Sequence, residues 1–532
     1  MGGGRYFMKF DRISTNAWTE SDEGWVAMEH YMPEIFWHDR KALLSVDFHP
    51  VVDSGAYRIV TSSVQKEVRI WRFEYEQCLK VPSKFQLAVT FLANLSGHNV
   101  AINQVKFSQN PEVNLLASGD SDGRIAIWQL SDAPSTAPPV DDLPPNKENW
   151  IRLRVLNHDS EVTNIAWSPD GKLIASVSND ESLFVHDVTS GKRCVSVRSL
   201  RHFPSGVAWD PKGKYIVTMS TDRKMDLIDA VKGTRLRAFG VCALPAVAVG
   251  DITLEHKVYK LFHDDQLMSF QRGVAFSPCG QLIIAPCANL EVGTHDLYGT
   301  LVFRRSELEN DKPLAFLPCP KATFLIRCCP LIMTLEKEET NYSGLPYRIL
   351  WLALTKDSVY LYDSQHPNPI GLVENIQYNS LTDAAWSSDG KNIVISSLEG
   401  YCTFLKLTVD QWGCKIENER MEECPPSPQL IQTKKRKPRE KKIKENKDEE
   451  TNESLAPPSQ KTTPLRPAAQ QVTTPRSGSL FRYLQSKGEE SPRSAQPASP
   501  TTPSRSKAEN APSQPSQPPI TKKRIALITL PD

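Results

Sequence analysis

Four histidines in this chain are followed directly by an aspartate, and a His–Asp contact is one way to hold a general base. The four pairs are His38–Asp39, His158–Asp159, His186–Asp187 and His263–Asp264. Adjacent residues on a β-strand point to opposite faces, so we expect none of these pairs to form a catalytic hydrogen bond within itself. The sequence also contains no nucleophile elbow, phosphate-binding loop or metal-ligand spacing. It therefore predicts a protein without enzymatic activity, metal site or cofactor.

The cysteines support the same interpretation. There are 11, an odd number with irregular spacing and no C-x-x-C pair. Cys328 and Cys329 lie next to each other inside an apolar run, which is typical of small core residues. We expect a reduced intracellular compartment and no zinc site.

The composition changes sharply along the chain. All 11 tryptophans precede Pro425, whereas the last 108 residues contain 18 of the 40 prolines and only two aromatic residues, Phe481 and Tyr483. Such a segment cannot bury enough apolar surface to offset the entropy of ordering it. We predict an N-terminal extension of unknown role at 1–31, a folded region at 32–415 and a disordered tail at 416–532. No apolar run approaches the length of about 18 residues that spans a membrane, and the net charge of +1 averages over opposite local patches.

The folded region repeats a short phrase in which an apolar residue and an aromatic residue precede a turn rich in Ser, Asp, Pro and Gly. The phrase occurs at 46–50, 105–110, 165–171, 207–213, 274–280 and 384–390. Proline and glycine supply the backbone angles of a tight turn, so each phrase predicts a strand that ends in a turn. Later in each repeat comes a strand that we predict to be the third of its unit. These strands are 68–71, 125–128, 183–187, 225–229, 300–303, 358–363 and 402–405.

Short, evenly spaced strands with a repeat near 40 residues are typical of a β-propeller. The seven third strands predict an all-β fold with seven blades. We expect residues 34–38 to supply the outer strand of the last blade and so to close the ring.

A second set of residues recurs in the turns of these repeats. His98, His158 and His202 open successive blades, Asp122 and Asp180 lie six residues before Trp128 and His186, and Asp222 follows in the next blade. The set resembles the WD-repeat family, in which such side chains form a buried hydrogen-bond network. Gln65 and Glu399 stand in place of the aspartate in the first and last blades. We therefore expect packing alone to hold those two blades together.

Several segments do not belong to the generic repeat. They are NKENW (146–150), LFHDDQLMSFQRGVAFSPCGQL (261–282), LPCPKATFLIRCCP (317–330), GLPYRILWLALTKDSVYLYDSQ (344–365) and LTDAAWSSDGKNIVISSLEGYCTF (381–404). Together they resemble the middle WD-repeat subunits of chromatin assembly factor 1, a seven-bladed WD40 propeller family.

That resemblance implies a non-catalytic role in a nuclear, three-subunit histone chaperone that deposits new histones H3 and H4 on DNA during replication and repair. The implied partners are a large subunit, a small histone-binding propeller, the histones and the anti-silencing histone chaperone. Contact with DNA would be weak or indirect, and no membrane partner is implied. One alternative is the sister family of replication-independent histone regulators, whose second folded region we do not find in this sequence. The other is a generic WD40 scaffold of a different nuclear complex.

A basic segment follows the folded region. TKKRKPREKKIKENK (433–447) holds nine Lys or Arg against two Glu, and basic runs of this kind are typical of nuclear localisation signals. The residues that we expect to act as the signal are Lys434, Lys435, Arg436, Lys437, Arg439, Lys441 and Lys442. A solvated charge run is the alternative. No aromatic residue interrupts the run, so stacking on nucleic-acid bases is not predicted.

Six Ser-Pro or Thr-Pro pairs occur in the tail, and they suit a proline-directed cell-cycle kinase. The candidate phosphorylation sites are Ser427, Thr463, Thr474, Ser491, Ser499 and Thr502. Each phosphate would add a charge of about −1.5 to −2.

The last apolar segment, TKKRIALITL (521–530), is β-prone and flanked by charges and proline. Such a segment can add as a strand to the open sheet edge of a partner. Its residues resemble the short motif by which the same family binds the anti-silencing histone chaperone, and the resemblance implies that role for five residues. They are Lys523, Arg524, Ile525, Leu527 and Leu530.

Overall fold

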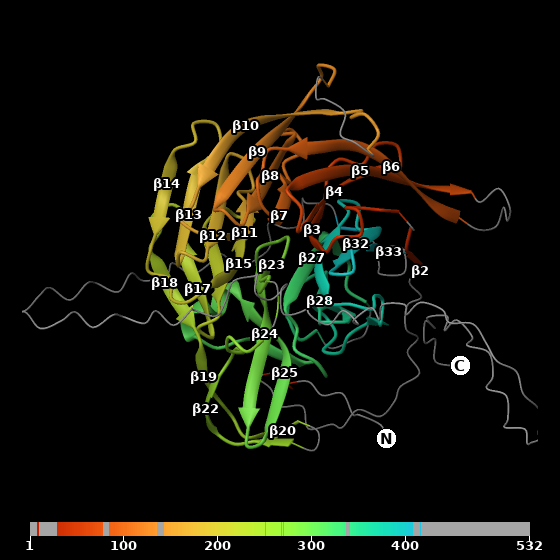
Figure 1. Cartoon of the computed structure of the whole chain (residues 1–532). Coiled ribbons are helices and arrows are strands. Elements are labelled where there is room, and N and C mark those ends of the chain that lie inside the picture. The colour runs from red at the N-terminus through yellow and green to blue at the C-terminus, as the bar shows by residue number, and fades with distance from the viewer. Residues whose placement is uncertain are drawn as a thin grey trace, which may run out of the picture.

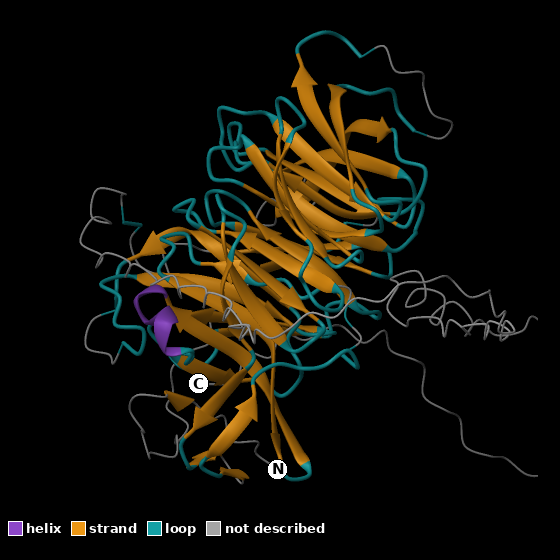
Figure 2. Ribbon diagram, turned by 90° about the vertical axis from the view of Figure 1, so that its left-hand side faces the viewer, coloured by secondary structure: helices purple, strands orange, loops and turns teal. Residues whose placement is uncertain are grey.

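The computed structural model describes residues 8–9, 29–33, 35–77, 85–135, 143–249, 252–267, 269, 271–336, 341–407 and 415–416. Within these ranges the chain forms 33 strands and one short 3-10 helix, η1 (Arg305–Asn310). Figure 2 shows how strongly strands dominate. No helix among these residues is long and apolar enough to cross a membrane.

The strands form a seven-bladed β-propeller, which confirms the predicted fold class (Figure 1). Blade 1 contains β3 (Leu43–Phe48), β4 (Tyr57–Ser63), β5 (Glu67–Gln77) and β6 (Phe85–Ser96). Blade 2 contains β7 (Ile102–Phe107), β8 (Leu115–Asp120), β9 (Arg124–Ser131) and β10 (Asn149–Asn157). Blade 3 contains β11 (Val162–Trp167), β12 (Leu173–Ser178), β13 (Ser182–Asp187) and β14 (Arg193–Val197). Blade 4 contains β15 (Pro204–Trp209), β16 (Tyr215–Ser220), β17 (Lys224–Asp229) and β18 (Arg235–Phe239).

The remaining blades include strands from both ends of the described chain. Blade 5 contains β23 (Ala275–Phe276), β24 (Leu282–Val292), β25 (His295–Arg304) and β26 (Ala315–Pro318), with β1 (Met8–Lys9) paired to β26. Blade 6 contains β27 (Leu325–Met333), β28 (Arg348–Leu354), β29 (Ser358–Asp363) and β30 (Gly371–Glu374). Blade 7 contains β31 (Leu381–Trp386), β32 (Asn392–Ser397), β33 (Cys402–Lys406) and β2 (Glu29–Tyr31). Each predicted third strand lies within β5, β9, β13, β17, β25, β29 or β33.

The first strand of every blade lies at the centre of the ring. Each of these strands contacts the first strands of the two neighbouring blades, and the series closes where β31 meets β3. Central strands are covered on both sides, which is why β3 and β31 are buried along their whole length.

The outer closure of the ring differs from our prediction. Residues 29–31, not 34–38, pair with β33, with Tyr31 opposite Phe404. Residues 37–40 instead form a turn that places the Trp37 side chain in the core between blades 1 and 7. Residues 29–31 of the predicted N-terminal extension therefore belong to blade 7, and its residues 8–9 pair with blade 5.

The glycine of the repeated turn phrase is required by a positive backbone φ angle. Gly171, Gly213, Gly280 and Gly390 all lie between the first and second strands of their blades, with φ values from 68° to 72°. This left-handed conformation is strained for a residue with a Cβ atom. The predicted strand-and-turn units are confirmed at these positions.

Two small two-stranded sheets stand between blades 4 and 5. One pairs β19 (Val241–Leu244) with β22 (Lys257–Lys260), and the other pairs β20 (Val247–Val249) with β21 (Ile252–Leu254). Figure 1 shows them beside the far end of the long β24–β25 hairpin, where Cys242 and Tyr259 are buried.

Candidate functional site

The WD-type network is complete in blade 2, but its carboxylate is not the predicted one. His98 lies with Nδ1 2.7 Å from Asp120 Oδ2 and Nε2 2.7 Å from Ser118 Oγ. Trp128 Nε1 donates to Ser118 Oγ at 2.8 Å. Asp122, which we expected in this network, lies in the turn, and its backbone amide donates to Asp120 Oδ1. The network thus runs from Trp128 through Ser118 and His98 to Asp120.

The position of this carboxylate leads to a stability prediction. Asp120 is fully buried, so Asp120→Ala leaves the His98 ring without its acceptor and should cost about 1–3 kcal/mol of unfolding free energy. Asp122→Ala, the matched control in the exposed turn, should change it by less than about 0.5 kcal/mol. Urea-induced unfolding followed by tryptophan fluorescence measures both, and equal losses would show that Asp122 carries the network.

Blade 3 places the predicted Asp180 against His158. The His158 Nδ1 atom is 3.4 Å from Asp180 Oδ2, and Nε2 is 2.7 Å from Ser176 Oγ. Burial would raise the pKa of Asp180, but hydrogen bonds from His158, Ser182 and the Asp159 amide outweigh it and hold that pKa well below its usual value. His186 stands where blade 2 has tryptophan, and burial lowers its pKa to about 4.

Blade 1 contains a network that the sequence did not predict. His38 Nε2 is 3.1 Å from Thr61 Oγ1, to which Trp71 Nε1 donates at 2.9 Å. Burial, followed by the nearby Arg69 charge, lowers the pKa of His38 to about 3, so the ring is neutral. The expectation that packing alone holds blade 1 together is wrong. The histidine was visible in the sequence, but the absence of an aspartate in the following turn hid its role.

The predicted network is not formed in blade 4. His202 is exposed with φ of 57°, and no hydrogen bond joins it to Asp222 among the described residues. The buried Thr218 Oγ1 correspondingly has no hydrogen-bond partner in that part of the chain. In blade 7, Glu399 accepts a hydrogen bond from the Tyr378 amide at 3.1 Å, so a polar contact adds to packing there as well.

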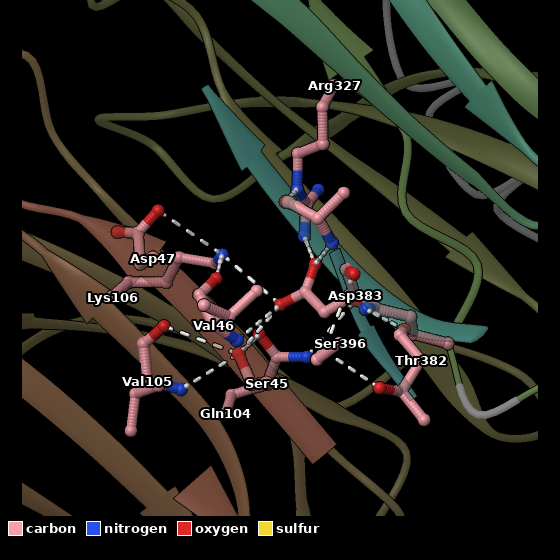
Figure 3. A network of polar contacts seen from close by, with 12 residues as sticks. Ser45, Val46, Asp47, Gln104, Val105, Lys106, Arg327, Thr382, Asp383 and Ser396 are labelled. Atoms are coloured by element: carbon pink, nitrogen blue, oxygen red, sulfur yellow. Dashed lines mark hydrogen bonds and ion pairs between the residues drawn. The ribbon is translucent and has the colours of Figure 1, made fainter. Parts of the chain in front are cut away.

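A second polar network crosses the centre of the ring (Figure 3). Asp383 of blade 7 is fully buried, and its Oδ1 accepts from Arg327 of blade 6 at 2.7 Å. Its Oδ2 accepts from Ser45 Oγ of blade 1 at 2.7 Å and lies 3.4 Å from Lys106 Nζ of blade 2. One carboxylate therefore ties four blades together.

The pKa values of the two carboxylates beside Lys106 shift in opposite directions. Burial would raise the pKa of Asp383, but the charges of Arg327 and Lys106 outweigh burial and lower it. Asp47 lies 3.6 Å from Lys106, and there burial dominates and raises the pKa. Asp383 is thus the ionised centre of the network.

Gln271 extends this network to another side of the ring. Its Oε1 accepts from Gln104 of blade 2 and Asn164 of blade 3, each at 3.1 Å. Its Nε2 donates to the Thr382 carbonyl of blade 7 at 3.0 Å. The Gln271 side chain, just before β23 of blade 5, thereby joins blades 2, 3 and 7 and makes the centre of the ring more rigid.

The long connection between β9 and β10, within blade 2, covers the outer edge of blade 1. The amides of Lys147 and Glu148 donate to the Leu92 carbonyl, and the Asn146 side chain bonds both backbone groups of Asn94. Glu148 also forms an ion pair with Arg58 at 2.6 Å. The loop segment 146–148 therefore covers the edge of β6 without forming a strand.

The His–Asp pairs do not all behave as expected. His263 Nδ1 lies 3.0 Å from Asp264 Oδ1, because this pair is in a loop where strand alternation does not apply. Among the described residues no group of three or more His, Cys, Asp or Glu is placed to hold a metal ion. Cys329 is buried, which raises the pKa of its thiol to about 12.

Several predicted sites lie outside the described residues. These are the chaperone-binding segment at 521–530, the basic segment at 433–447 and the six Ser/Thr-Pro sites.

Comparison with known proteins shows which family has this ring. Residues 28–411 match the family described as "CAF1B/HIR1 beta-propeller domain". The chain is similar to the B subunit of chromatin assembly factor 1 from Gallus gallus, with 33% identity over 402 residues that cover 73% of this chain and 69% of the relative. It is also similar to the B subunit from Saccharomyces cerevisiae, with 28% identity over 433 residues that cover 74% of this chain and 89% of the relative. Similarity to protein HIR1 of Kluyveromyces lactis is 23% over 385 residues, covering 69% of this chain and 42% of the relative.

Proposed function

The chain belongs to the CAF1B/HIR1 β-propeller family, and from this membership we propose that it is the B subunit of a chromatin assembly factor. In this role it has no catalytic step of its own. It holds together a nuclear complex that deposits newly made histones H3 and H4 on DNA during replication and repair. The match across nearly the whole ring is the observation that carries the proposal.

The choice within the family rests on identity. The B subunits of chromatin assembly factor 1 from animals and yeasts are 28–33% identical to this chain, whereas the HIR1 proteins are 23–24% identical. This difference favours replication-coupled assembly over the replication-independent alternative.

The structure supports a scaffolding role physically. Asp383 and Gln271 join blades across the ring centre, and buried networks join strands within blades 1, 2 and 3. A ring fixed in this way presents its loops and outer strands in constant positions, which a partner subunit can recognise without first ordering them. We propose that the propeller docks the large subunit of the complex.

The tail adds three further functions to the proposal. The basic segment 433–447 directs the protein to the nucleus, and the six Ser/Thr-Pro sites receive phosphate from a cell-cycle kinase. The segment 521–530 binds the anti-silencing histone chaperone by adding a strand to one of its sheets. Histones then pass from that chaperone to the complex.

Affinity purification from nuclei tests the proposal. The tagged full chain should recover a large Lys/Glu-rich subunit, a smaller histone-binding propeller and histones H3 and H4, identified by mass spectrometry. An unrelated seven-bladed WD40 protein with the same tag serves as the control. Recovery of a stable complex that contains neither histones nor a histone chaperone would contradict the proposal and favour a generic scaffold.

A further inference from the structure

The outer strands of the blades differ in how their free edges are covered. β6 is covered by residues 146–148, and β26 is paired with β1. β10 forms the end of the blade 2 sheet, and in the described part of the chain no backbone segment pairs with its far edge. It has nine residues, against five in β14, five in β18 and four in β30. β10 is therefore the longest of these open edges.

The side chains along this edge are unusually apolar for a surface. Five consecutive residues, 151–155, are exposed. Among them Ile151, Leu153 and Val155 are 45%, 38% and 41% exposed, so β10 carries more large exposed aliphatic residues than any other strand in the described structure. A β-bulge between Arg152 and Arg154 leaves Leu153 without a partner on β9.

Two arginines give the same edge a positive charge. Arg152 donates to the Gly97 carbonyl at 3.2 Å, and Arg154 donates to the Thr189 carbonyl at 3.0 Å. Neither forms an ion pair within the described residues, so both charges are available to an acidic partner while the carbonyls hold the side chains in place. Arg152 is bonded on the side of blade 1 and Arg154 on the side of blade 3. A guanidinium group therefore lies on each side of β10.

Charged residues and bulges also protect exposed edges from indiscriminate strand pairing. The two arginines would repel basic strands and attract acidic ones. The charges that protect the β10 edge from aggregation therefore also favour binding of an acidic partner segment. The covered edges of β6 and β26 show that this fold accepts an added segment at an outer strand.

We propose that the outer edge of β10 binds an extended segment of a partner subunit that carries aliphatic and acidic side chains, adding a fifth strand to blade 2. Main-chain hydrogen bonds hold the segment, its aliphatic residues cover Ile151, Leu153 and Val155, and its carboxylates meet Arg152 and Arg154. This inference rests on the proposed function, because the partner it expects is the large subunit of the complex.

The affinity of the full chain for the purified large subunit tests whether the β10 edge is the binding site. Arg152→Glu/Arg154→Glu should weaken binding by at least about tenfold, since each reversed charge repels the acidic guest. Ile151→Ser/Val155→Ser should weaken it as well, while keeping the salt dependence that the two arginines give the wild-type contact. The control is Val231→Ser/Lys232→Glu, which makes the same kinds of change in an exposed turn of blade 4 and should leave binding unchanged. Unchanged circular dichroism and urea midpoints establish that each variant is folded.

A photo-crosslinking amino acid in place of Leu153 identifies the occupant in the assembled complex. A crosslink to an aliphatic and acidic segment of the partner subunit supports the inference. A crosslink to this chain's own tail, to a second copy or to a basic segment overturns it, as does wild-type affinity in both double variants. If the wild-type chain fails to bind the large subunit at all, the proposed function itself is wrong.

Discussion

Asp383→Asn should lower the free energy of unfolding by about 3 kcal/mol, the low end of what is lost when one member of a buried ion pair is removed. The substitution keeps the shape of the side chain but removes the charge that faces Arg327 and Lys106. Both cations retain some exposure to solvent, at 19% and 15% of their side chains, which is why the low end is expected. Urea-induced unfolding of the full chain measures the loss.

Asp47→Asn is the matched control, because Asp47 approaches the same lysine. Burial raises the pKa of Asp47, so its ionised form costs stability at neutral pH and its neutralisation is tolerated. Its acceptor role toward the Phe107 amide is kept by the amide oxygen of asparagine. We expect a change within about 1 kcal/mol.

The pH dependence gives the same prediction a second readout. The pKa of Asp383 is lowered in the folded state, so its stabilisation is complete above the unfolded value of about 3.9 and is lost as pH falls toward the folded value. The difference between wild type and Asp383→Asn should therefore begin to shrink as the pH falls below about 4. A constant difference down to the folded value would show that the asparagine acts through packing and not through charge.

Ile525→Ala and Leu527→Ala should each weaken binding to the anti-silencing histone chaperone by about 30-fold or more. Removing a large aliphatic side chain from a filled pocket costs about 2–5 kcal/mol. Since every 1.4 kcal/mol is about tenfold, such losses weaken binding by about 30-fold or more. Isothermal titration of the full chain with the purified chaperone measures the effect.

Ile528→Ala is the control for this motif. On a regular strand Ile525 and Leu527 share one face, whereas Ile528 points to the other. The motif residues Ile525, Leu527 and Leu530 cannot all share one face of a regular strand, so the bound segment must bend after Leu527. A mild effect of Ile528→Ala fits that geometry. A loss as large as that of Leu527→Ala would rule out the proposed mode of binding, while leaving the propeller's docking role untouched.

The blades could be predicted from the sequence because their signals are local. A turn phrase such as 165–171 and a third strand such as 125–128 each lie within a few residues, and both have the same backbone requirements in every blade. The ring closure could not be placed as well. Residues 34–38 are as apolar as a strand, but burying Trp37 between two blades requires a turn there.

The WD-type networks of blades 2 and 3 show that motif spacing alone does not identify the hydrogen-bonded carboxylate. Asp122 and Asp180 occupy matching places in the turns of blades 2 and 3, since the strands on either side pair in the same register. The blade 2 carboxylate nevertheless comes from Asp120, at the end of β8. Spacing fixes where the backbone goes, but not which of two nearby carboxylates turns toward the histidine.

The central network could not be predicted for a different reason. Ser45 and Asp383 are 338 residues apart, and neither belongs to a recurring phrase of the repeat. Their contact exists only once seven blades have formed a closed ring. A feature of this kind depends on the whole fold, so a single sequence carries no local sign of it.

The pairing of β2 with β33 affects how the chain can fold during translation. β2 is the first strand of blade 7 to be synthesised, and it finds its partner only when β33, the last of the described strands, has been made. During translation the early blades must persist as an open arc, with the inner face of β3 waiting for β31. Non-local closure of this sort is slow, and the exposed end strands of an arc can meet other nascent chains. We therefore expect a chaperone for newly made protein to bind chiefly at the exposed strands of blades 1 and 7, before these two blades pack together.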